Sequence, residues 1–186
     1  MPTHDPQLPG LVAAARQGVP DAWDALFRRY QLPLYAYSVE LLKDSAASLD
    51  VVQETFIRAL KHLGGLREDA RFGAWLFGIA HQLILAQWRR LGRDPGPNAE
   101  PESPGEDVAF EPGPDLTAIR QEEERAVLAA IDELPPAQRS VILLFFLEDF
   151  SLAEIAEATA TTLGTVKSRL HYAKAALRRK LTCLAP

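Results

Sequence analysis

The sequence contains a single cysteine, Cys183, so the chain cannot form an internal disulfide. Its four histidines are scattered, and no group of Cys and His has the spacing of a metal site. No nucleophile–base pair and no phosphate-binding glycine motif is visible, which argues against an enzyme. We therefore expect a protein with no metal, no other cofactor and no catalytic residue.

Long apolar runs are also missing. No stretch reaches the roughly eighteen apolar residues that suggest a transmembrane helix, and the start of the chain lacks the charged and then apolar pattern of a secretory signal. The net charge is −5, whereas a free-standing DNA-binding protein usually has a basic excess. We expect a cytoplasmic protein in which any contact with nucleic acid is confined to local surfaces.

Strand patterns and internal repeats are nearly absent. Apolar residues recur at spacings of three and four rather than alternating. The predicted fold class is therefore all-α. Helices are expected over 9–17, 20–42, 45–63, 70–91, 116–133, 136–147, 151–158 and 163–181.

Residues 92–115 are rich in proline and glycine, and they hold seven acidic side chains against one arginine. Such a segment buries too little apolar area to offset the entropy of ordering it. We interpret it as a flexible acidic linker between two small helical domains, 10–91 and 116–182. An ordered surface loop is the alternative.

Carboxylates are missing from Ala158 to the end of the chain, although six Lys and Arg occur there. Ser151 and Glu154 fit a capping box that starts a short helix, and Thr162 can cap a longer one after a tight turn. One face of that longer helix carries an apolar stripe. The stripe consists of Val166, Leu170, Ala173, Leu177 and Leu181.

The other face of the longer helix is basic and polar. A short helix, a turn and a second helix with a basic outer face form the helix-turn-helix geometry that enters a DNA major groove. A carboxylate on this face would meet phosphate oxygens, which explains why acids are missing. A solvated basic helix end is the alternative. The candidate DNA contacts are Thr162, Thr165, Lys167, Ser168, Arg169, His171, Tyr172 and Lys174.

The expected helix 45–63 has an apolar stripe and a polar face. On the polar face, Ile57 lies among carboxylates and could be the apolar centre of a protein docking patch. Helix geometry alone favours a solvated face, since an isolated exposed Ile is common. The expected buried stripe is Leu49, Val52, Phe56, Ala59, Leu60 and Leu63, and the polar face is Asp50, Gln53, Glu54 and Lys61.

The expected helix 70–91 carries a flank of aromatic, amide and basic side chains, Trp75, Gln82 and Arg89. Basic residues beside aromatic ones can bind unpaired bases by stacking and phosphate contact. The preceding glycine-rich loop carries Arg67 and Arg71 and could accommodate a flipped-out base. A place for Trp75 in the core is the alternative.

Taken in order, the segments DVVQETF, RFGAWLFGIA, the acidic linker, LPPAQR, SLAEIAE and GTVKSRL resemble the extracytoplasmic-function (ECF) sigma factors of bacterial RNA polymerase. The resemblance implies that 10–91 is region 2 and 116–182 is region 4. It implies binding to core RNA polymerase, promoter-specific initiation of transcription and control by an anti-sigma factor.

The resemblance also assigns roles to residues. It implies that the polymerase β′ clamp is contacted by Asp50, Val52, Gln53, Glu54 and Ile57. It implies that the −10 promoter element is opened and read as single strand by Arg67, Arg71, Trp75, Gln82 and Arg89. The helix-turn-helix would then read the −35 element, and Val141, Leu144 and Phe145 could contact the β flap.

Three departures from the family pattern bear on these roles. The acidic run that usually precedes DVVQ is reduced to Ala-Ser-Leu-Asp50, so the affinity for the clamp can differ. Where the family has the letters IARN, this chain has Ile79, Ala80, His81 and Gln82, so its −10 preference can differ. Where the family turn has Leu-Gly, this chain has Thr159 and Ala160, and an alanine forced into the left-handed conformation costs about 1 kcal/mol. Two rival hypotheses stay open: a regulator that binds an operator without polymerase, and a polymerase-binding protein that no longer initiates.

Overall fold

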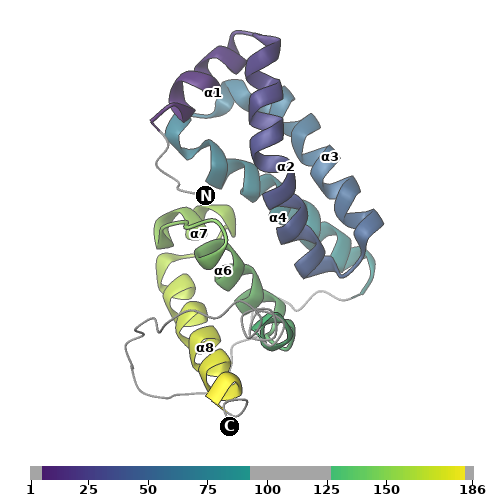
Figure 1. Ribbon diagram of the computed structural model, residues 1–186, viewed down its shortest axis with the longest axis vertical. Helices are drawn as coiled ribbons and strands as arrows, with labels where there is room; N and C mark the ends of the chain where they lie inside the picture. Colours follow the sequence, from purple (N-terminus) through teal and green to yellow (C-terminus); the bar gives the residue numbers. More distant parts are fainter. Residues whose placement is uncertain (1–5, 93–126, 183–186) are drawn as a thin grey trace, which may run out of the picture.

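The computed structural model describes residues 6–92 and 127–182, and within these ranges every regular element is helical. The all-α prediction is confirmed. The expected linker lies outside the described residues beyond Gly92, as does the beginning of the expected helix 116–133. The elements are α1 (Leu8–Arg16), α2 (Pro20–Leu42), α3 (Ser45–His62), the short η1 (Leu63–Gly65) and η2 (Asp69–Arg71), α4 (Phe72–Arg90), a helical stretch over 127–132, α6 (Pro136–Phe146), α7 (Leu152–Ala158) and α8 (Leu163–Thr182) (Figure 1).

The helix ends follow from local chemistry. Asp44 caps α3 by accepting a hydrogen bond from the backbone N–H of Ala47 at 3.0 Å. The capping box that was expected for α7 is present: Ser151 Oγ accepts from the Glu154 amide at 3.3 Å, and the Ser151 amide donates to the Glu154 carboxylate at 2.9 Å. Thr162 Oγ1 accepts from the Thr165 amide at 3.1 Å, as predicted for the start of α8.

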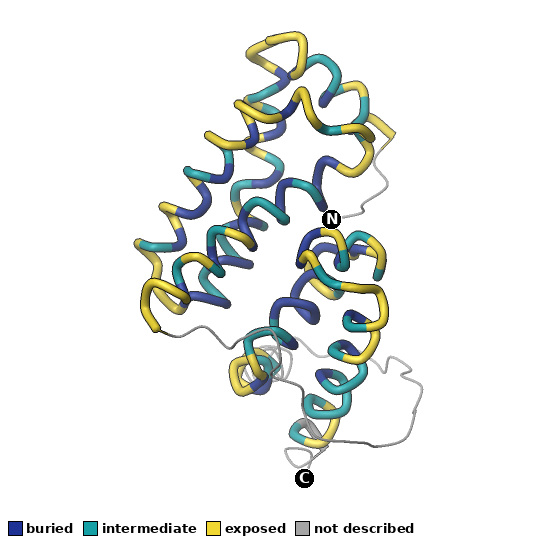
Figure 2. The backbone as a smooth tube through the Cα atoms, turned by 180° about the vertical axis from the view of Figure 1, so that it is seen from behind, coloured by how far each residue is buried: buried dark blue, intermediate teal, exposed yellow. Residues whose placement is uncertain are grey.

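The N-terminal lobe, α1 to α4, is built around α2, which packs against α1, α3 and α4. Its buried residues face inward on each helix, while exposed ones face solvent (Figure 2). The largest fully buried side chains of this lobe include Leu26, Leu34, Tyr37, Phe72, Leu76 and Phe77.

The buried face of α3 agrees with the predicted stripe at Val52, Ala59 and Leu63 and differs from it at other positions. Leu49 and Leu60 are 60% and 61% exposed, whereas Ser48 and Thr55 are fully buried. The two hydroxyls donate to the main-chain carbonyl oxygens four residues earlier, both at 2.6 Å, so these two buried hydroxyls are satisfied within their own helix. A pattern that counts only apolar residues misses such positions, and it therefore assigned Leu49 and Leu60 to the core in place of Ser48 and Thr55.

The C-terminal lobe, from 127 to the end of α8, packs α6 and α7 against α8. Val166, Leu170 and Ala173 are buried, which confirms that part of the predicted stripe. Val141 and Leu144, which were considered for the β flap, are fully buried and have no free surface.

The two lobes pack against each other. Helix α7 lies on α4, and α6 lies beside α2 (Figure 1). The buried apolar residues of both lobes form one continuous cluster. Phe77 of α4 and Phe150, just before α7, meet edge to face with ring centroids 5.3 Å apart.

Candidate nucleic-acid interface

The helix-turn-helix is closed by a left-handed residue. Ala160 has φ of 51°, so alanine does adopt the conformation for which glycine is usual, at about 1 kcal/mol. Hydrogen bonds hold the turn: Thr161 N–H donates to Ala156 C=O at 2.9 Å, and Thr159 Oγ1 donates to Ile155 C=O at 2.7 Å. The departure from the usual glycine therefore leaves the turn intact.

The outer face of α8 begins with hydroxyls and a lysine. Thr162, Lys167 and Ser168 are exposed, and Thr165 is half-buried. Further along, the half-buried rings of His171 and Tyr172 pack edge to face at 5.5 Å. These predicted DNA contacts lie along one helix, in reach of a single groove.

Two other predicted contacts of α8 lie differently. Arg169 is half-buried beside α4, and burial lowers the pKa of its guanidinium. The ammonium of Lys174 lies 4.5 Å from the ring centroid of Phe145 and 5.5 Å from that of Phe146, in cation–π contact. In this conformation Lys174 is engaged within the molecule, and Arg169 is partly withdrawn from solvent.

The predicted single-strand face of α4 borders the second lobe. Trp75 and Gln82 line a hollow of about 270 Å³, and its other wall is Glu157, Ala158 and Ala160. Trp75 is half-buried at this edge. It packs against the core on one side and lines the hollow on the other.

The three arginines that were predicted to contact the −10 element, Arg67, Arg71 and Arg89, are all exposed. Arg67 lies in the loop before η2, and Arg89 donates to the Leu85 carbonyl oxygen at 3.3 Å. Arg71 forms ion pairs with Glu68 at 2.7 Å and with Glu157 of α7 at 3.0 Å. A phosphate approaching Arg71 would therefore compete with two carboxylates.

The outer face of α3 is more apolar than the sequence indicated. Asp50, Gln53 and Ile57 are exposed as expected, but Leu49 and Leu60 lie there too. These two leucines were missed as surface residues because their spacing also fits a core stripe.

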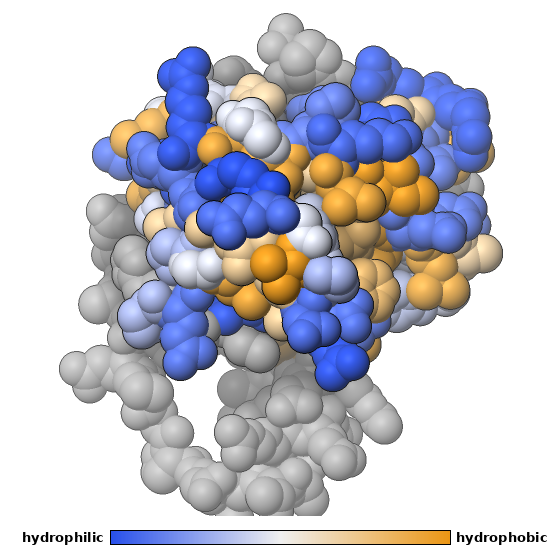
Figure 3. Space-filling view, turned by 90° about the horizontal axis from the view of Figure 1, so that it is seen from above, coloured by the Kyte–Doolittle hydropathy of each residue, from blue (hydrophilic) through white to orange (hydrophobic). Residues whose placement is uncertain are grey.

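The same surface continues onto α2. Phe27 of α2 is 42% exposed and packs on Phe56 of α3 with ring centroids 4.8 Å apart. Among the predicted contacts on α3, Val52 is buried, and Glu54 is half-buried and pairs with Arg58 at 2.7 Å. Seen from above, hydrophobic side chains gather on the side of the molecule where α2 and α3 lie (Figure 3).

His81 is a buried residue that sequence reasoning treated only as a departure from the family pattern. Its Nδ1 lies 2.8 Å from the Tyr37 hydroxyl, which also hydrogen-bonds Ser140 of α6. Burial, with the positive charge of Arg169 as the smaller cause, lowers the pKa of His81 to about 4. The imidazole is therefore neutral at physiological pH and sits where the two lobes join.

In the parts of the chain that the structure describes, no three His, Cys, Asp or Glu side chains gather as a metal site would need. None of the helices described there has the length and apolar character to span a membrane.

Comparisons with known proteins agree with this geometry. Residues 26–94 match the family Sigma-70 region 2, and residues 124–177 match Sigma-70, region 4. The RNA polymerase sigma-H factor of Pseudomonas aeruginosa is 31% identical over 180 residues, covering 92% of this chain and 92% of that protein. The ECF RNA polymerase sigma factor SigL of Mycobacterium tuberculosis is 35% identical over 161 residues, covering 84% and 87%.

Solved structures share the fold. The structure of CnrH in complex with the cytosolic domain of CnrY aligns with a TM-score of 0.67 and 25% identity, over 95% of this chain and 97% of that one. The sigma factor RpoE of Bartonella quintana, in complex with the anti-sigma factor NepR, aligns with a TM-score of 0.63 and 24% identity, over 86% and 96%.

Proposed function

The chain belongs to the ECF sigma factors of bacterial RNA polymerase, and from this premise we propose how its surfaces share the work of transcription initiation. Members of this family are initiation factors rather than known enzymes. We assign 10–91 to region 2, 92–115 to a linker and 116–182 to region 4. The protein acts in the cytoplasm and needs no cofactor.

The outer face of α3 docks on the clamp of core polymerase. Asp50, Gln53 and Ile57 supply a polar rim and an apolar centre, which is the usual anatomy of a protein interface. The exposed Leu49 and Leu60 extend the apolar part. Glu54 contributes from the edge, while the buried Val52 acts by fixing the position of the helix in its lobe.

The loop before α4 and the adjoining face of α4 bind the −10 element as single strand. Trp75 offers a ring for base stacking, and Arg67, Arg71 and Arg89 offer cations for the backbone. Gln82 supplies an amide that can hydrogen-bond a base edge.

The exposed face of α8 reads the −35 element in the major groove. The observation that carries this proposal is the combination of a capped helix-turn-helix with a second helix that has an apolar inner face and no carboxylate. Lys167 contacts phosphate, and Thr162, Thr165, Ser168, His171 and Tyr172 face the groove. Lys174 joins them only after leaving its aromatic partners, and the half-buried Arg169 only after its side chain turns outward.

A partner protein of the anti-sigma class holds the factor inactive. Support comes from the fold shared with CnrH, whose structure contains the cytosolic domain of another protein, CnrY. The partner must cover surfaces that otherwise meet polymerase or DNA.

Promoter-dependent transcription with purified core polymerase tests the proposed function. We expect Lys167→Ala to reduce initiation about tenfold while core binding stays unchanged, because a phosphate contact is lost. We expect Leu60→Ser to weaken core binding by about tenfold, because an apolar interface residue is lost. Leu91→Ser, which removes an equally exposed leucine at the end of α4, is the matched control for the second change.

The competing hypotheses give other results. An operator-binding regulator would bind duplex DNA specifically without polymerase, and Leu60→Ser would then leave its activity intact. If the wild-type chain binds core but starts transcription from no promoter fragment, the proposal of a working initiation factor is rejected.

A further inference from the structure

An arginine of the first helix holds the loop between α3 and α4. Arg16, the last residue of α1, donates to both carboxylate oxygens of Asp69, at 2.5 and 3.3 Å. Its guanidinium also donates to the carbonyl oxygen of Leu66 at 3.1 Å. The paired bonds to Asp69 use the planar fork of arginine, which matches the geometry of a carboxylate. We call Arg16, Leu66 and Asp69 together the brace.

The brace spans the part of the loop that carries a proposed −10 contact. Arg67 comes directly after Leu66 and two residues before Asp69, so the chain is fixed on both sides of Arg67 while its side chain stays exposed. Asp69 is also the first residue of η2, and Arg71 is the last. The brace therefore determines where the main chain presents both arginines.

The chain reaches the brace through open space. A Cβ added to Gly64 or Gly65 would meet no atom within 4 Å. Leu66 packs on the core with its half-buried side chain, and its amide donates to the Leu63 carbonyl oxygen at 3.1 Å. These contacts hold the beginning of the loop, whereas the bonds from Arg16 to Asp69 hold its far end. The course of the loop across Arg67 therefore depends on the brace.

The brace is carried by a firmly packed helix end. Val12 and Ala15 of α1 are buried, and Trp23 of α2 donates from its Nε1 to the Ala15 carbonyl oxygen at 3.1 Å. The residue before Arg16 is thus fixed through both its side chain and its main chain. Helix α1 lies in contact with η2 (Figure 1). A residue that positions a binding loop needs such rigid support.

The brace also offsets a charge that opposes DNA binding. The loop carries two carboxylates, Glu68 and Asp69, beside its two arginines. Glu68 pairs with Arg71 at 2.7 Å, and Asp69 pairs with Arg16. Without Arg16, the charge of Asp69 would repel the phosphates that the loop arginines are proposed to meet. Loss of Arg16 would thus disturb both the position of the loop and its charge.

We propose that Arg16 is a positioning residue for −10 recognition: it holds the loop 66–71 in the shape in which Arg67 and Arg71 meet the single strand. The inference rests on the proposed function of this loop and deepens it. Arg16 acts through Leu66 and Asp69 rather than by touching DNA. The match to Sigma-70 region 2 begins at residue 26, so α1 and its arginine precede the matched residues.

Promoter opening by the holoenzyme tests the proposal. A fluorescent adenine analogue in the −10 element, on a fragment that the wild-type holoenzyme opens, brightens as the bases unstack. We expect Arg16→Ala to slow opening about tenfold, because charged hydrogen bonds that hold the loop are lost. Core affinity and binding to the closed fragment should stay unchanged. Arg16→Lys keeps the charge but not the fork, and it should recover part of the rate.

A double-mutant cycle shows whether Arg16 acts through Asp69. In an Asp69→Ala background, Arg16→Ala should slow opening by no more than about twofold, because only the bond to the Leu66 carbonyl oxygen is left to lose. Arg28→Ala removes the cation of an exposed pair within α2 and should open the fragment at the wild-type rate. Circular dichroism and melting confirm that each variant is folded.

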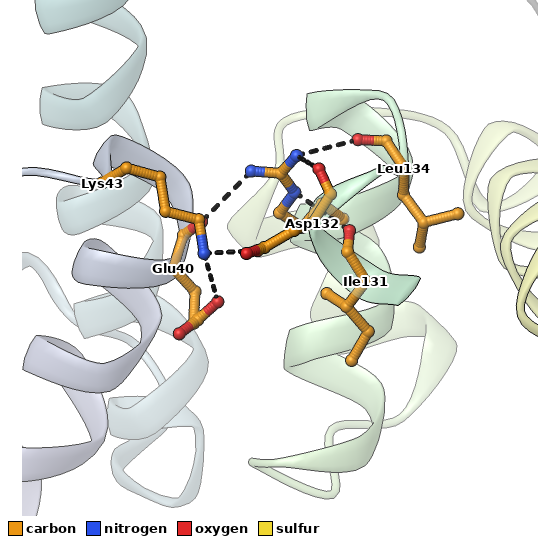
Figure 4. Close-up of polar contacts among 6 residues, drawn as sticks. Glu40, Lys43, Ile131, Asp132 and Leu134 are labelled. Atoms are coloured by element: carbon orange, nitrogen blue, oxygen red, sulfur yellow. Dashed lines mark hydrogen bonds and ion pairs between the residues drawn. The ribbon is translucent and has the colours of Figure 1, made fainter. Parts of the chain in front are cut away.

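Hydrogen exchange on the free, full-length chain reports the loop itself. The Arg71 amide donates to the Glu68 carbonyl oxygen at 2.9 Å, and we expect it to exchange about fivefold faster in Arg16→Ala. Lys43→Ala is the matched control. Lys43 also lies at a helix end, and it pairs with Glu40 at 2.7 Å and with Asp132 of a distant segment (Figure 4). Its removal should leave exchange of the Arg71 amide unchanged.

The proposal is overturned if Arg16→Ala opens the fragment at the wild-type rate. It is also overturned if opening slows while loop exchange stays unchanged, or if core binding weakens as much as opening does. Arg67→Ala separates these results from the proposed function. If Arg67→Ala slows opening and Arg16→Ala does not, the positioning role alone is rejected. If Arg67→Ala opens the fragment normally, the loop does not bind the −10 element and the proposed function of the loop fails with it.

Discussion

At the scale of residues, the position that departs from the family letters has a structural role. His81 is 5% exposed and hydrogen-bonded to Tyr37, so its imidazole is not available to DNA in this structure. Inside a region 2 domain standing alone, the same imidazole would lack the neighbouring Arg169 and the chain to Ser140. The histidine that stands here in place of the family's arginine is therefore part of the contact between the lobes.

The lowered pKa of His81 predicts a pH dependence of stability. Unfolding returns the pKa from about 4 to its usual 6.5, so the unfolded chain takes up a proton that the folded chain excludes. The stability supplied by this group is complete above pH 6.5 and is lost as the pH falls toward 4. Between pH 7 and pH 5 we expect a loss of about 2 kcal/mol in the free energy of unfolding.

Urea denaturation at both pH values, of wild type and of His81→Asn, checks this prediction. The asparagine retains hydrogen-bonding capacity but does not titrate, so its pH dependence should be weaker by the stated amount. Glu148 acts in the opposite direction, because burial raises its pKa to about 7, and comparison of the two chains cancels its contribution. If the free energy of unfolding changes by the same amount between the two pH values in both chains, the prediction is contradicted.

At the scale of elements, the turn of the helix-turn-helix carries a removable strain. Ala160 is left-handed, whereas Ala153 is the second residue of α7, has helical φ and is also exposed. We expect Ala160→Gly to raise the free energy of unfolding by about 0.5–1 kcal/mol, because glycine adopts positive φ without strain. Ala153→Gly, the matched control, should lower it by about 1 kcal/mol.

Denaturant unfolding of the two glycine variants gives the answer directly. Loss of stability in both would mean that the left-handed turn costs this chain nothing. The departure from the usual glycine would then have no energetic consequence.

Helix boundaries were predictable because capping residues and prolines act locally. Ser151 with Glu154 and the Pro135–Pro136 pair placed the ends of α6 and α7 within about one residue. The inner face of α8 was also predictable, because Val166, Leu170 and Ala173 recur at helical spacing, but the partial burial of Arg169 and the contact of Lys174 with Phe145 were not. The face of α3 was not, since Ser48 and Thr55 enter the core by bonding their own helix, which apolar periodicity cannot detect.

At the scale of the whole molecule, the contact between the lobes could not be predicted from the sequence. Gly73, Gly78 and Phe150 mean little until α4 and α7 are placed together, since a glycine in a helix has no pattern of its own. The same holds for candidate sites: the residues of α4 and α8 were found one helix at a time. That α7 borders the flank of α4 depends on contacts between residues far apart in the chain.

The shared core predicts that both lobes unfold together. Because Phe150 of region 4 is buried against Phe77 of α4, the wild-type protein should melt in a single cooperative transition. Phe150→Ala removes the ring that meets Phe77 across the contact, at a cost of about 3–5 kcal/mol, and should separate the melting of the lobes into two steps. Leu26→Ala, a fully buried change inside region 2, should lower the midpoint without dividing the transition. Scanning calorimetry distinguishes these outcomes, and two well-separated transitions in the wild type would show that the lobes are energetically independent.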